Sequence, residues 1–218
     1  AAMTERLLTH GSILPSERKM SQTLELSRVT VVKALDALLE AGLVIKRHGK
    51  GTEVNLPVSY NLASGGFSAQ LQNSGTVSNR WLVREKLAAD DFLARELEIA
   101  VGDRVAKIKR VRLVDALPVS IETMFIPERF LPRPDLLEGS LYAHWAENNI
   151  FPDLQDYSLT VHIPSGEELN LLDLPQGVPL MKITLKSRNA QGEVLEYGTA
   201  FCLSNYFNFD FRVKLQSA

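Results

Sequence analysis

The chain has 218 residues, of which 45% are hydrophobic and 23% charged, and its formal net charge is -2 at pH 7. This composition is typical of a globular protein and excludes disordered, collagen-like and disulfide-scaffold chains. No apolar run approaches the ~18–20 residues that a membrane span needs, so we expect no membrane partner. The single cysteine, Cys202, cannot form an internal disulfide. Together with the lack of a visible secretory signal, this predicts a cytoplasmic protein.

Charge is unevenly distributed along the chain. Residues 1–55 contain eight Lys/Arg and six Asp/Glu, a net charge of +2, which leaves 16 basic and 20 acidic residues, a net charge of -4, in the remainder. A small basic region in front of an acidic body is expected of a chain whose first part meets phosphate.

The amino-terminal region predicts a succession of helices. A short helix is expected over residues 3–9. Ser16 is a favourable N-cap for a second helix, which closes at 24–26. Ser27 caps the next helix, in which apolar residues recur at helical spacing until Gly42, a residue type common where helices end.

A small hairpin follows these helices. The segments 43–47 and 51–55 predict two short strands, and the glycines at 49 and 51 permit a tight turn between them. Two helices joined by a short turn and followed by a hairpin predict a winged helix-turn-helix. In such a domain the N-terminal residues of the recognition helix meet the major groove of DNA.

Four sequence blocks carry a family resemblance in this region. LPSER at 14–18, SRVTV at 27–31, ALDALLEAGLV at 34–44 and RHGKGTEV at 47–54 resemble the amino-terminal domain of GntR-superfamily transcription regulators. The resemblance implies that the following residues contact DNA: Ser16, Arg18, Ser27, Arg28, Thr30, His48, Gly49, Lys50 and Gly51. The family usually has Arg where this chain has Val32, so we expect Lys33 to supply a phosphate contact instead.

The chain is therefore expected to divide into a DNA-binding domain at 1–56, a linker and ligand-closing loop at 57–75, and a second domain at 76–218. In the second domain the sequence predicts both strands and helices. The strands are expected at 77–87, 104–114, 118–127, 179–188, 193–203 and 206–215, and the helices at 90–97, 139–148 and 165–172. Hairpins with few intervening helices favour an antiparallel sheet. The predicted fold class is α+β throughout.

The second domain resembles the UTRA effector-binding domain of the HutC-like branch of the GntR superfamily, whose fold is similar to that of chorismate lyase. The blocks that carry this resemblance are RVRLVDALPVSIETMFIP at 110–127 and GEVLEYGTAFCLSNYFNF at 192–209. The chain departs from the family at 202–204, where Cys-Leu-Ser stands in place of a frequent Tyr-Arg-Gly. This departure predicts an altered pocket shape.

Strand alternation places Arg110 and Arg112 on one side of a strand, and Ser120 and Glu122 on one side of the next. Two guanidinium groups beside a hydroxyl and a carboxylate predict a cradle for a small anionic, hydroxylated molecule, such as a sugar phosphate or a carboxylate. The resemblance implies that the arginine pair holds a phosphate, and that Glu122 and Glu196 bind hydroxyl or amine groups. It also implies a loop that closes over the ligand, at Gly66, Phe67 and Ser68.

Other interpretations of these residues remain open at this stage. The arginines could instead lie on an outward-facing strand in cross-strand pairs, such as Arg112 with Glu122. Tyr142 and Trp145 are expected in the core rather than stacked on a ligand, and Cys202 is expected as a small apolar filler. The four histidines lack metal-ligand spacing, so we expect no metal and no cofactor.

The sequence favours a DNA-binding transcription regulator, a metabolite-responsive repressor that binds a near-palindromic operator on double-stranded DNA as a homodimer. Two other classes compete with it. The chain could be an enzyme of chorismate-lyase-like fold, although no catalytic motif is present and fold alone does not carry function. It could also be a DNA-binding protein whose tail only dimerises and takes no ligand.

Overall fold

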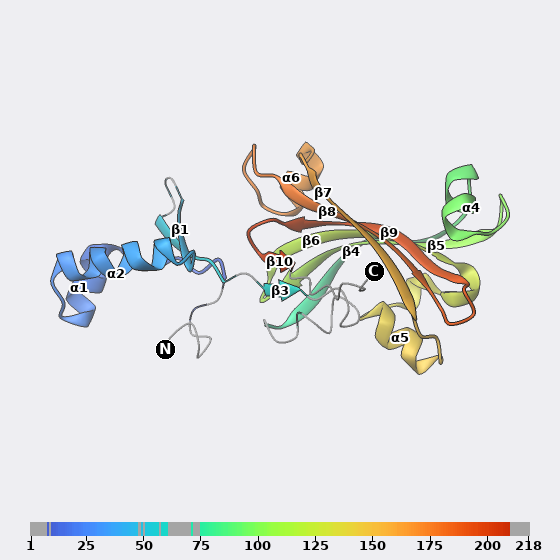
Figure 1. Ribbon diagram of the computed structural model, residues 1–218, viewed down its shortest axis with the longest axis horizontal. Helices are drawn as coiled ribbons and strands as arrows, with labels where there is room; N and C mark the ends of the chain where they lie inside the picture. The colour runs from blue at the N-terminus through green and yellow to red at the C-terminus, as the bar shows by residue number, and fades with distance from the viewer. Residues whose placement is uncertain are drawn as a thin grey trace, which may run out of the picture. The chain divides into compact units, whose positions relative to one another are not determined.

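A computed structural model of the chain describes residues 8, 10–47, 49, 51–56, 58–60, 71 and 75–209. The chain divides into two compact units. The first unit comprises Ala1–Ser59 and Asn205–Asn208, and the second comprises Tyr60–Ser204 and Phe209–Ala218. Figure 1 shows helices and small strands in the first unit and a large sheet in the second.

Both predicted N-caps of the first unit are present. Helix α1 spans Glu17–Leu24, and the Ser16 hydroxyl accepts a hydrogen bond from the Lys19 backbone N–H. Helix α2 spans Arg28–Glu40, and the Ser27 hydroxyl accepts one from the Thr30 backbone N–H at 3.1 Å. These contacts satisfy backbone donors that the first turn of a helix leaves without partners. The helix expected at 3–9 lies, apart from Leu8, outside the described residues.

The wing also forms as predicted. Strand β1 (Val44–Arg47) pairs antiparallel with β2 (Gly51–Val54). The core beneath α2 and the wing is small, and the buried apolar residues in it are Val31, Leu35, Val44 and Val54. A core of this size holds α2 against the wing while leaving most of the helix surface exposed.

A second pair of strands in the first unit joins segments far apart in the sequence. Strand β3 (Val58–Tyr60) pairs with β10 (Phe207–Phe209), and the Val58 N–H donates to the Tyr206 carbonyl at 2.6 Å. Of the strand expected at 206–215, the structure describes only β10, which pairs with β3 and not with the large sheet. Residues 210–215 lie outside the described residues.

The second unit is built on one antiparallel sheet of six strands in the order β4-β5-β6-β9-β8-β7. Its strands are β4 (Val77–Ala88), β5 (Arg104–Val114), β6 (Leu117–Pro127), β7 (Leu154–His162), β8 (Leu180–Arg188) and β9 (Val194–Leu203). Five of these strands were predicted, and β7 was missed. It is a half-exposed strand between Pro152 and Pro164 whose apolar alternation is weak.

Helices cover both faces of this sheet. Helix α5 (Leu141–Glu147) packs on one face, and α4 (Asp91–Leu97) and α6 (Gly166–Leu171) lie on the other (Figure 1). Their predicted caps Asp90, Ser140 and Ser165 each accept a backbone hydrogen bond at the helix start. Trp145 of α5 is fully buried among the apolar side chains of β5 and β6. Two short 3-10 helices, η1 (Glu128–Phe130) and η2 (Pro134–Leu136), precede α5.

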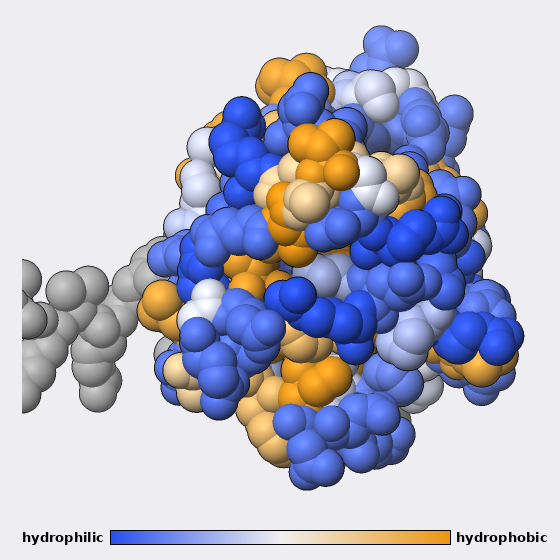
Figure 2. Space-filling view, turned by 90° about the vertical axis from the view of Figure 1, so that its right-hand side faces the viewer, coloured by the Kyte–Doolittle hydropathy of each residue, from blue (hydrophilic) through white to orange (hydrophobic). Residues whose placement is uncertain are grey.

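Seen toward its right-hand side in Figure 1, the second unit is mostly hydrophilic, and its hydrophobic residues gather in small separate groups (Figure 2). Among the described helices, none is both long and apolar enough to cross a membrane.

Candidate nucleic-acid interface and candidate ligand site

The N-terminal end of α2 presents polar side chains to solvent. Ser27 and Thr30 share a hydrogen bond between their hydroxyl oxygens at 2.8 Å, and Arg28 stands exposed between them. The first backbone N–H groups of a helix carry a partial positive charge. The capped end of α2 therefore combines donors, hydroxyls and a guanidinium in the position that a recognition helix turns toward DNA.

The first unit also carries exposed cations that form no ion pair with the residues that the structure describes. Within the described residues, no carboxylate forms an ion pair with these side chains: Arg18, Lys19, Arg28, Lys33 and Lys46. Val32, at the position where Arg was expected from the family, is partly buried, whereas the adjacent Lys33 is exposed. Cations that the protein itself does not neutralise are available to phosphate.

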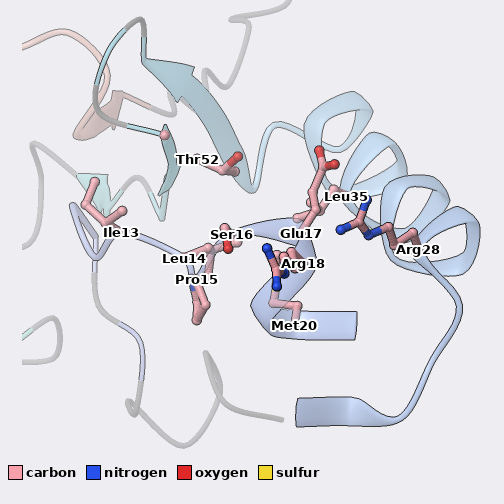
Figure 3. A pocket seen from close by; sticks show the side chains of 11 residues that line it. Ile13, Leu14, Pro15, Ser16, Glu17, Arg18, Met20, Arg28, Leu35 and Thr52 are labelled. Carbon is pink, nitrogen blue, oxygen red and sulfur yellow. The ribbon is translucent and has the colours of Figure 1, made fainter. Parts of the chain in front are cut away.

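A hollow of about 520 Å³ brings together residues from three elements of this unit. Its lining includes Ser16, Arg18, Arg28 and Thr52. In Figure 3 the guanidinium of Arg28 points from α2 toward Glu17 and Arg18 of α1. The fold therefore gathers into one basic concavity four of the predicted DNA-contacting residues, Ser16, Arg18, Arg28 and Gly51, although they lie up to 35 positions apart in the chain.

The wing turn is only partly described. Gly49 and Gly51 have φ angles of 74° and 98°, which non-glycine residues rarely adopt, so glycine is required for this tight turn. His48 and Lys50, also predicted to contact DNA, lie outside the described residues.

The sequence analysis missed Val29, the second residue of α2. Its side chain is 65% exposed, two residues after the N-cap Ser27. The predicted DNA contacts were mostly charged and hydroxyl side chains, whereas an exposed methyl group can also contact a base.

The second unit contains the polar cluster that the sequence predicted as a ligand site. The described part of the chain buries six polar or charged side chains: Arg110, Arg112, Ser120, Glu122, Ser187 and Glu196. Five of these six were predicted site residues. Ser187 is the one that was missed. Cross-strand register places Arg110 opposite Glu122, and Arg112 opposite Ser120, on the face that α5 covers.

The two arginines share one carboxylate. Arg110 Nε donates to Glu122 Oε2 at 2.8 Å, and Arg112 Nε lies 3.7 Å from Glu122 Oε1. Further bonds orient both guanidinium groups: Arg110 Nη1 donates to the Gly139 carbonyl, and Arg112 Nη1 to Asn79 Oδ1. The Arg–Glu pairs of the alternative interpretation are thus present. They are buried, however, so the outward-facing strand of that interpretation is wrong.

Electrostatics keep Glu122 ionised. Burial raises the pKa of the Glu122 carboxyl, but the charges of Arg110 and Arg112 and the hydrogen bond from Arg110 outweigh burial and hold that pKa below its ordinary value. The three side chains together carry a net charge of about +1, since arginine stays protonated in proteins.

Glu196 lies in a different environment on the same face. Its Oε1 accepts hydrogen bonds from the Tyr142 and Ser187 hydroxyls, the latter at 3.1 Å. Burial raises the pKa of Glu196 to about 7, although both hydrogen bonds act to lower it. Tyr142 packs against the core as predicted, but its hydroxyl is part of this polar network and also accepts a bond from Gln155 at 2.8 Å.

Two polar groups in the cluster keep bonding capacity. Within the described residues, the Ser120 hydroxyl is buried and has no hydrogen-bond partner, and no hydrogen bond reaches Glu196 Oε2. A buried hydroxyl without a partner is costly, so such groups usually have a ligand or water to bind. The cluster can therefore bind an anion through its arginines and hydroxyl or amine groups through Ser120 and Glu196.

The loop predicted to close over a ligand, Gly66, Phe67 and Ser68, lies outside the described residues. Cys202 is fully buried in the core, as expected of an apolar filler. In the part of the chain that the structure describes, no group of His, Cys, Asp or Glu is arranged to hold a metal ion.

A winged helix-turn-helix with exposed cations, followed by an α+β unit with a buried polar cluster, is the organisation of a DNA-binding transcription regulator. Family comparisons agree with this assignment. Residues 2–54 match the family model described as bacterial regulatory proteins, gntR family, and residues 72–208 match the UTRA domain. The chain belongs to the GntR family of regulators that carry a UTRA domain.

Individual relatives match the chain over most of its length. The chain is 31% identical over 210 residues to the HTH-type transcriptional regulator GgaR of Escherichia coli, covering 95% of this chain and 85% of GgaR. It is 30% identical to MngR of Escherichia coli, a mannosyl-D-glycerate transport/metabolism system repressor, covering 93% and 85% of the two chains. The crystal structure of PhnF from Mycobacterium smegmatis has the same fold, with a TM-score of 0.74, 24% identity and 99% coverage of each chain.

These relatives are transcription regulators, so the expected class is confirmed and the enzyme alternative is dismissed. The chain is a DNA-binding regulator.

Proposed function

We propose that the protein is a metabolite-responsive repressor that binds a near-palindromic operator as a homodimer. The first unit supplies the DNA interface through the N-terminal end of α2, the basic concavity and the wing. The proposed contacts are Ser16, Arg18, Ser27, Arg28, Thr30, Lys33, His48, Gly49, Lys50 and Gly51. Two-fold dimers of such domains bind half-sites one helical turn of DNA apart, which is why we propose a near-palindrome.

The observation that carries the effector-binding half of the proposal is the buried cluster in the second unit. We assign the effector to Arg110, Arg112, Ser120, Glu122 and Glu196, with the loop at Gly66, Phe67 and Ser68 closing over it. Within this cluster, Arg110, Arg112 and Glu122 together carry a net charge of about +1, which favours an anion. Hydroxyl or amine groups on the same effector would bind Ser120 and Glu196. The name of the relative MngR refers to mannosyl-D-glycerate, which combines a carboxylate with hydroxyls and so belongs to this chemical class.

A tail that only dimerises is a weaker explanation of the same residues. Burying two arginines and two glutamates costs desolvation energy that well-packed apolar residues would avoid. In a dimerisation domain without a ligand, nothing offsets this desolvation cost. In a receptor for an anion, binding of the anion to the buried arginines offsets it. The domain boundaries at 1–56, 57–75 and 76–218 belong to this proposal.

The effector acts by shifting a population. It changes operator binding only to the extent that it binds more tightly to one arrangement of the two DNA-binding units than to the other. In this mechanism the effector does not change the DNA-binding unit itself. It changes the distance or orientation between the two DNA-binding units of the dimer.

Two linked measurements test the proposal. Operator sequences are first selected from random duplexes with the full-length protein, and we expect two related half-sites. Sugar phosphates, sugar acids, amino acids and small carboxylates are then screened for a rise in melting temperature, and each hit is titrated into a mobility-shift assay on the selected operator. We expect at least one anionic hit to change operator affinity tenfold or more. A protein that selects no sequence, or whose operator affinity no stabilising anion alters, would contradict the proposal.

A further inference from the structure

The two buried carboxylates of the second unit differ in their partners. Glu122 lies between two cations, with guanidinium nitrogens of Arg110 and Arg112 at 2.8 and 3.7 Å from its oxygens. Glu196 is only 1% exposed, yet it forms no ion pair with any described residue, and its hydrogen bonds come from hydroxyl groups alone. Buried charges are normally paired, so Glu196 in its ionised form requires a cation.

A chain of hydrogen bonds directs donors toward one oxygen of Glu196. The Tyr157 hydroxyl donates to Gln155 Oε1 at 3.0 Å, and Gln155 Nε2 donates to the Tyr142 hydroxyl oxygen at 2.8 Å. Because the Tyr142 oxygen accepts this bond, its proton points to Glu196 Oε1, which also accepts from the Ser187 hydroxyl. Hydrogen bonds in such a chain polarise one another and favour the charged form of the final acceptor.

The second oxygen of Glu196 is open to a ligand. In the part of the chain that the structure describes, no hydrogen bond reaches Glu196 Oε2. Strand register puts Glu196 on the α5 face with the arginine pair, since Ser120 faces Cys202 and the side chains of β9 alternate from there. An ammonium group has three donors, no acceptor and a positive charge, so it matches both needs of this carboxylate. A hydroxyl group supplies a donor only.

The site therefore has two poles of opposite charge. Arg110, Arg112 and Glu122 form the positive pole, with a net charge of about +1, and an ionised Glu196 forms the negative pole. Glu122 faces Ala200, and Glu196 lies four residues before Ala200 on β9, a backbone separation of roughly 13 Å at about 3.4 Å per residue. This spacing favours a ligand whose two charged groups lie several bonds apart over an α-amino acid, in which one carbon carries both.

We propose that the effector is a zwitterion whose anionic group binds the arginine pair and whose ammonium group binds Glu196. Gln155 and Tyr157 are positioning residues, which act through the Tyr142 hydroxyl on Glu196. This inference rests on the proposed function and narrows its effector to one chemical class. Burial raises the pKa of Glu196 to about 7, which agrees with the inference, since the protein's own groups do not compensate that charge.

Matched pairs of small anions test this class on the full-length protein. The members of each pair share one anionic group and differ in an ammonium or a hydroxyl group at the same carbon: 4-aminobutyrate with 4-hydroxybutyrate, taurine with isethionate, and glucosamine 6-phosphate with glucose 6-phosphate. We expect at least one ammonium probe to bind at least tenfold more tightly than its hydroxyl partner in calorimetric titrations. Glu196→Gln should abolish that preference, whereas Ser158→Ala, on the opposite face of β7 from Gln155, should keep it.

The outcomes separate this inference from the proposed function. If amine-free anions bind as tightly as the ammonium probes, or bind when no ammonium probe does, the zwitterion is overturned and an anion-responsive regulator remains. An ammonium preference that survives Glu196→Gln would overturn the assignment to Glu196. A protein that binds no anion of either kind would contradict the proposed function together with the inference.

Proton release provides a second test. The charged and titratable groups that interact with Glu196 are Tyr142 of α5, Tyr157 of β7, Glu122 of β6 and Arg110 of β5. An ammonium probe fixes Glu196 in its charged form, so about one proton should leave the protein on binding at pH 6 and far less than one at pH 8. The dependence of the binding enthalpy on the ionisation enthalpy of the buffer measures this number. No release at pH 6 would overturn the contact between the ammonium group and Glu196.

The same measurement tests the positioning residues, because a purely structural role would not shift the pH at which the proton leaves. Gln155→Leu removes the bond that orients the Tyr142 hydroxyl, so the midpoint of proton release should rise by about half a pH unit or more. Tyr157→Phe removes only the first donor of the chain and should shift the midpoint less in the same direction. A midpoint that neither variant moves would overturn the positioning role.

Discussion

The two units use basic residues in opposite ways. In the first unit, exposed basic side chains that form no ion pair with any described residue are Arg18, Lys19, Arg28, Lys33 and Lys46. In the second unit, most basic side chains are paired, and Arg110 and Arg112 are buried against Glu122. An exposed cation without a partner attracts phosphate non-specifically, whereas a buried and oriented one recognises a small anion of defined shape. The burial of a basic side chain therefore indicates whether it is suited to bind DNA phosphate or a small anion.

Salt should separate the two units most clearly. Operator binding releases counterions from DNA, so a dimer that engages about six phosphates should lose about three orders of magnitude in affinity between 50 and 200 mM salt. Effector affinity should change far less, because buried charges are weakly screened. Mobility-shift and calorimetric titrations over the same salt range measure both.

The variant Lys33→Gln sharpens this test. Since each neutralised phosphate contributes about 0.9 to the slope of log K against log salt, the slope of a dimer should fall by about 2. The partly buried Val32 offers a control through Val32→Ala, which should leave the slope unchanged. A flat salt dependence in the wild type would show that the exposed cations do not meet DNA.

Removing a buried arginine should destabilise the second unit strongly. Arg112→Ala leaves the buried Glu122 carboxylate with one cationic partner, and breaking a buried pair in this way typically costs about 3–5 kcal/mol of unfolding free energy. The variant should also lose the rise in melting temperature that the effector produces, while retaining operator binding. Denaturant unfolding and thermal shift with and without effector measure these effects.

Two further variants control for loss of folding. Arg112→Lys keeps the charge but not the planar fork, so it should fold yet bind the effector weakly. Arg133→Ala breaks an exposed pair with Asp135 and should alter neither property measurably. An effector response preserved in both Arg112 variants would show that the arginines do not belong to the ligand site.

The pKa of Glu196 predicts a pH dependence of stability. Because burial raises that pKa from 4.5 to about 7, the folded protein holds a proton that the unfolded chain releases. This contribution to stability is fully present below pH 4.5, and it is lost as pH rises to about 7. Since one pH unit corresponds to about 1.4 kcal/mol, the loss amounts to about 3 kcal/mol.

Comparison with Glu196→Gln isolates this effect. Glutamine mimics the protonated acid and does not titrate, so the difference in unfolding free energy between the two proteins should favour the wild type most below pH 4.5. Urea unfolding at half-unit steps from pH 4.5 to 8 measures it. Parallel pH profiles would show that Glu196 titrates at its ordinary value.

The sequence predicted most elements and much of the ligand site because the signals were local. Capping residues such as Ser16 and Ser27 act on the next turn of the chain, and strand alternation relates Arg110 to Arg112 within three residues. Ser187 and the Tyr142 hydroxyl were missed as partners of Glu196 because tertiary packing brings them together. Strand β7 was missed because an edge strand that is half exposed needs little apolar periodicity.

The smallest expected effect concerns base reading by Val29, which is 65% exposed at the start of α2. A methyl group there can pack against the 5-methyl of a thymine in the major groove. Burying one methyl-sized group is worth about 0.8 kcal/mol, which corresponds to about a fourfold change in affinity. Replacing single thymines of the operator by deoxyuridine removes only that methyl, so one position per half-site should weaken wild-type binding about fourfold. Val29→Ala should bind both duplexes equally, and Leu24→Ala, which removes another exposed apolar side chain of the first unit, should behave as the wild type. Equal sensitivity of the wild type and Val29→Ala at every thymine would exclude Val29 from base contact and leave recognition to the polar groups of α2.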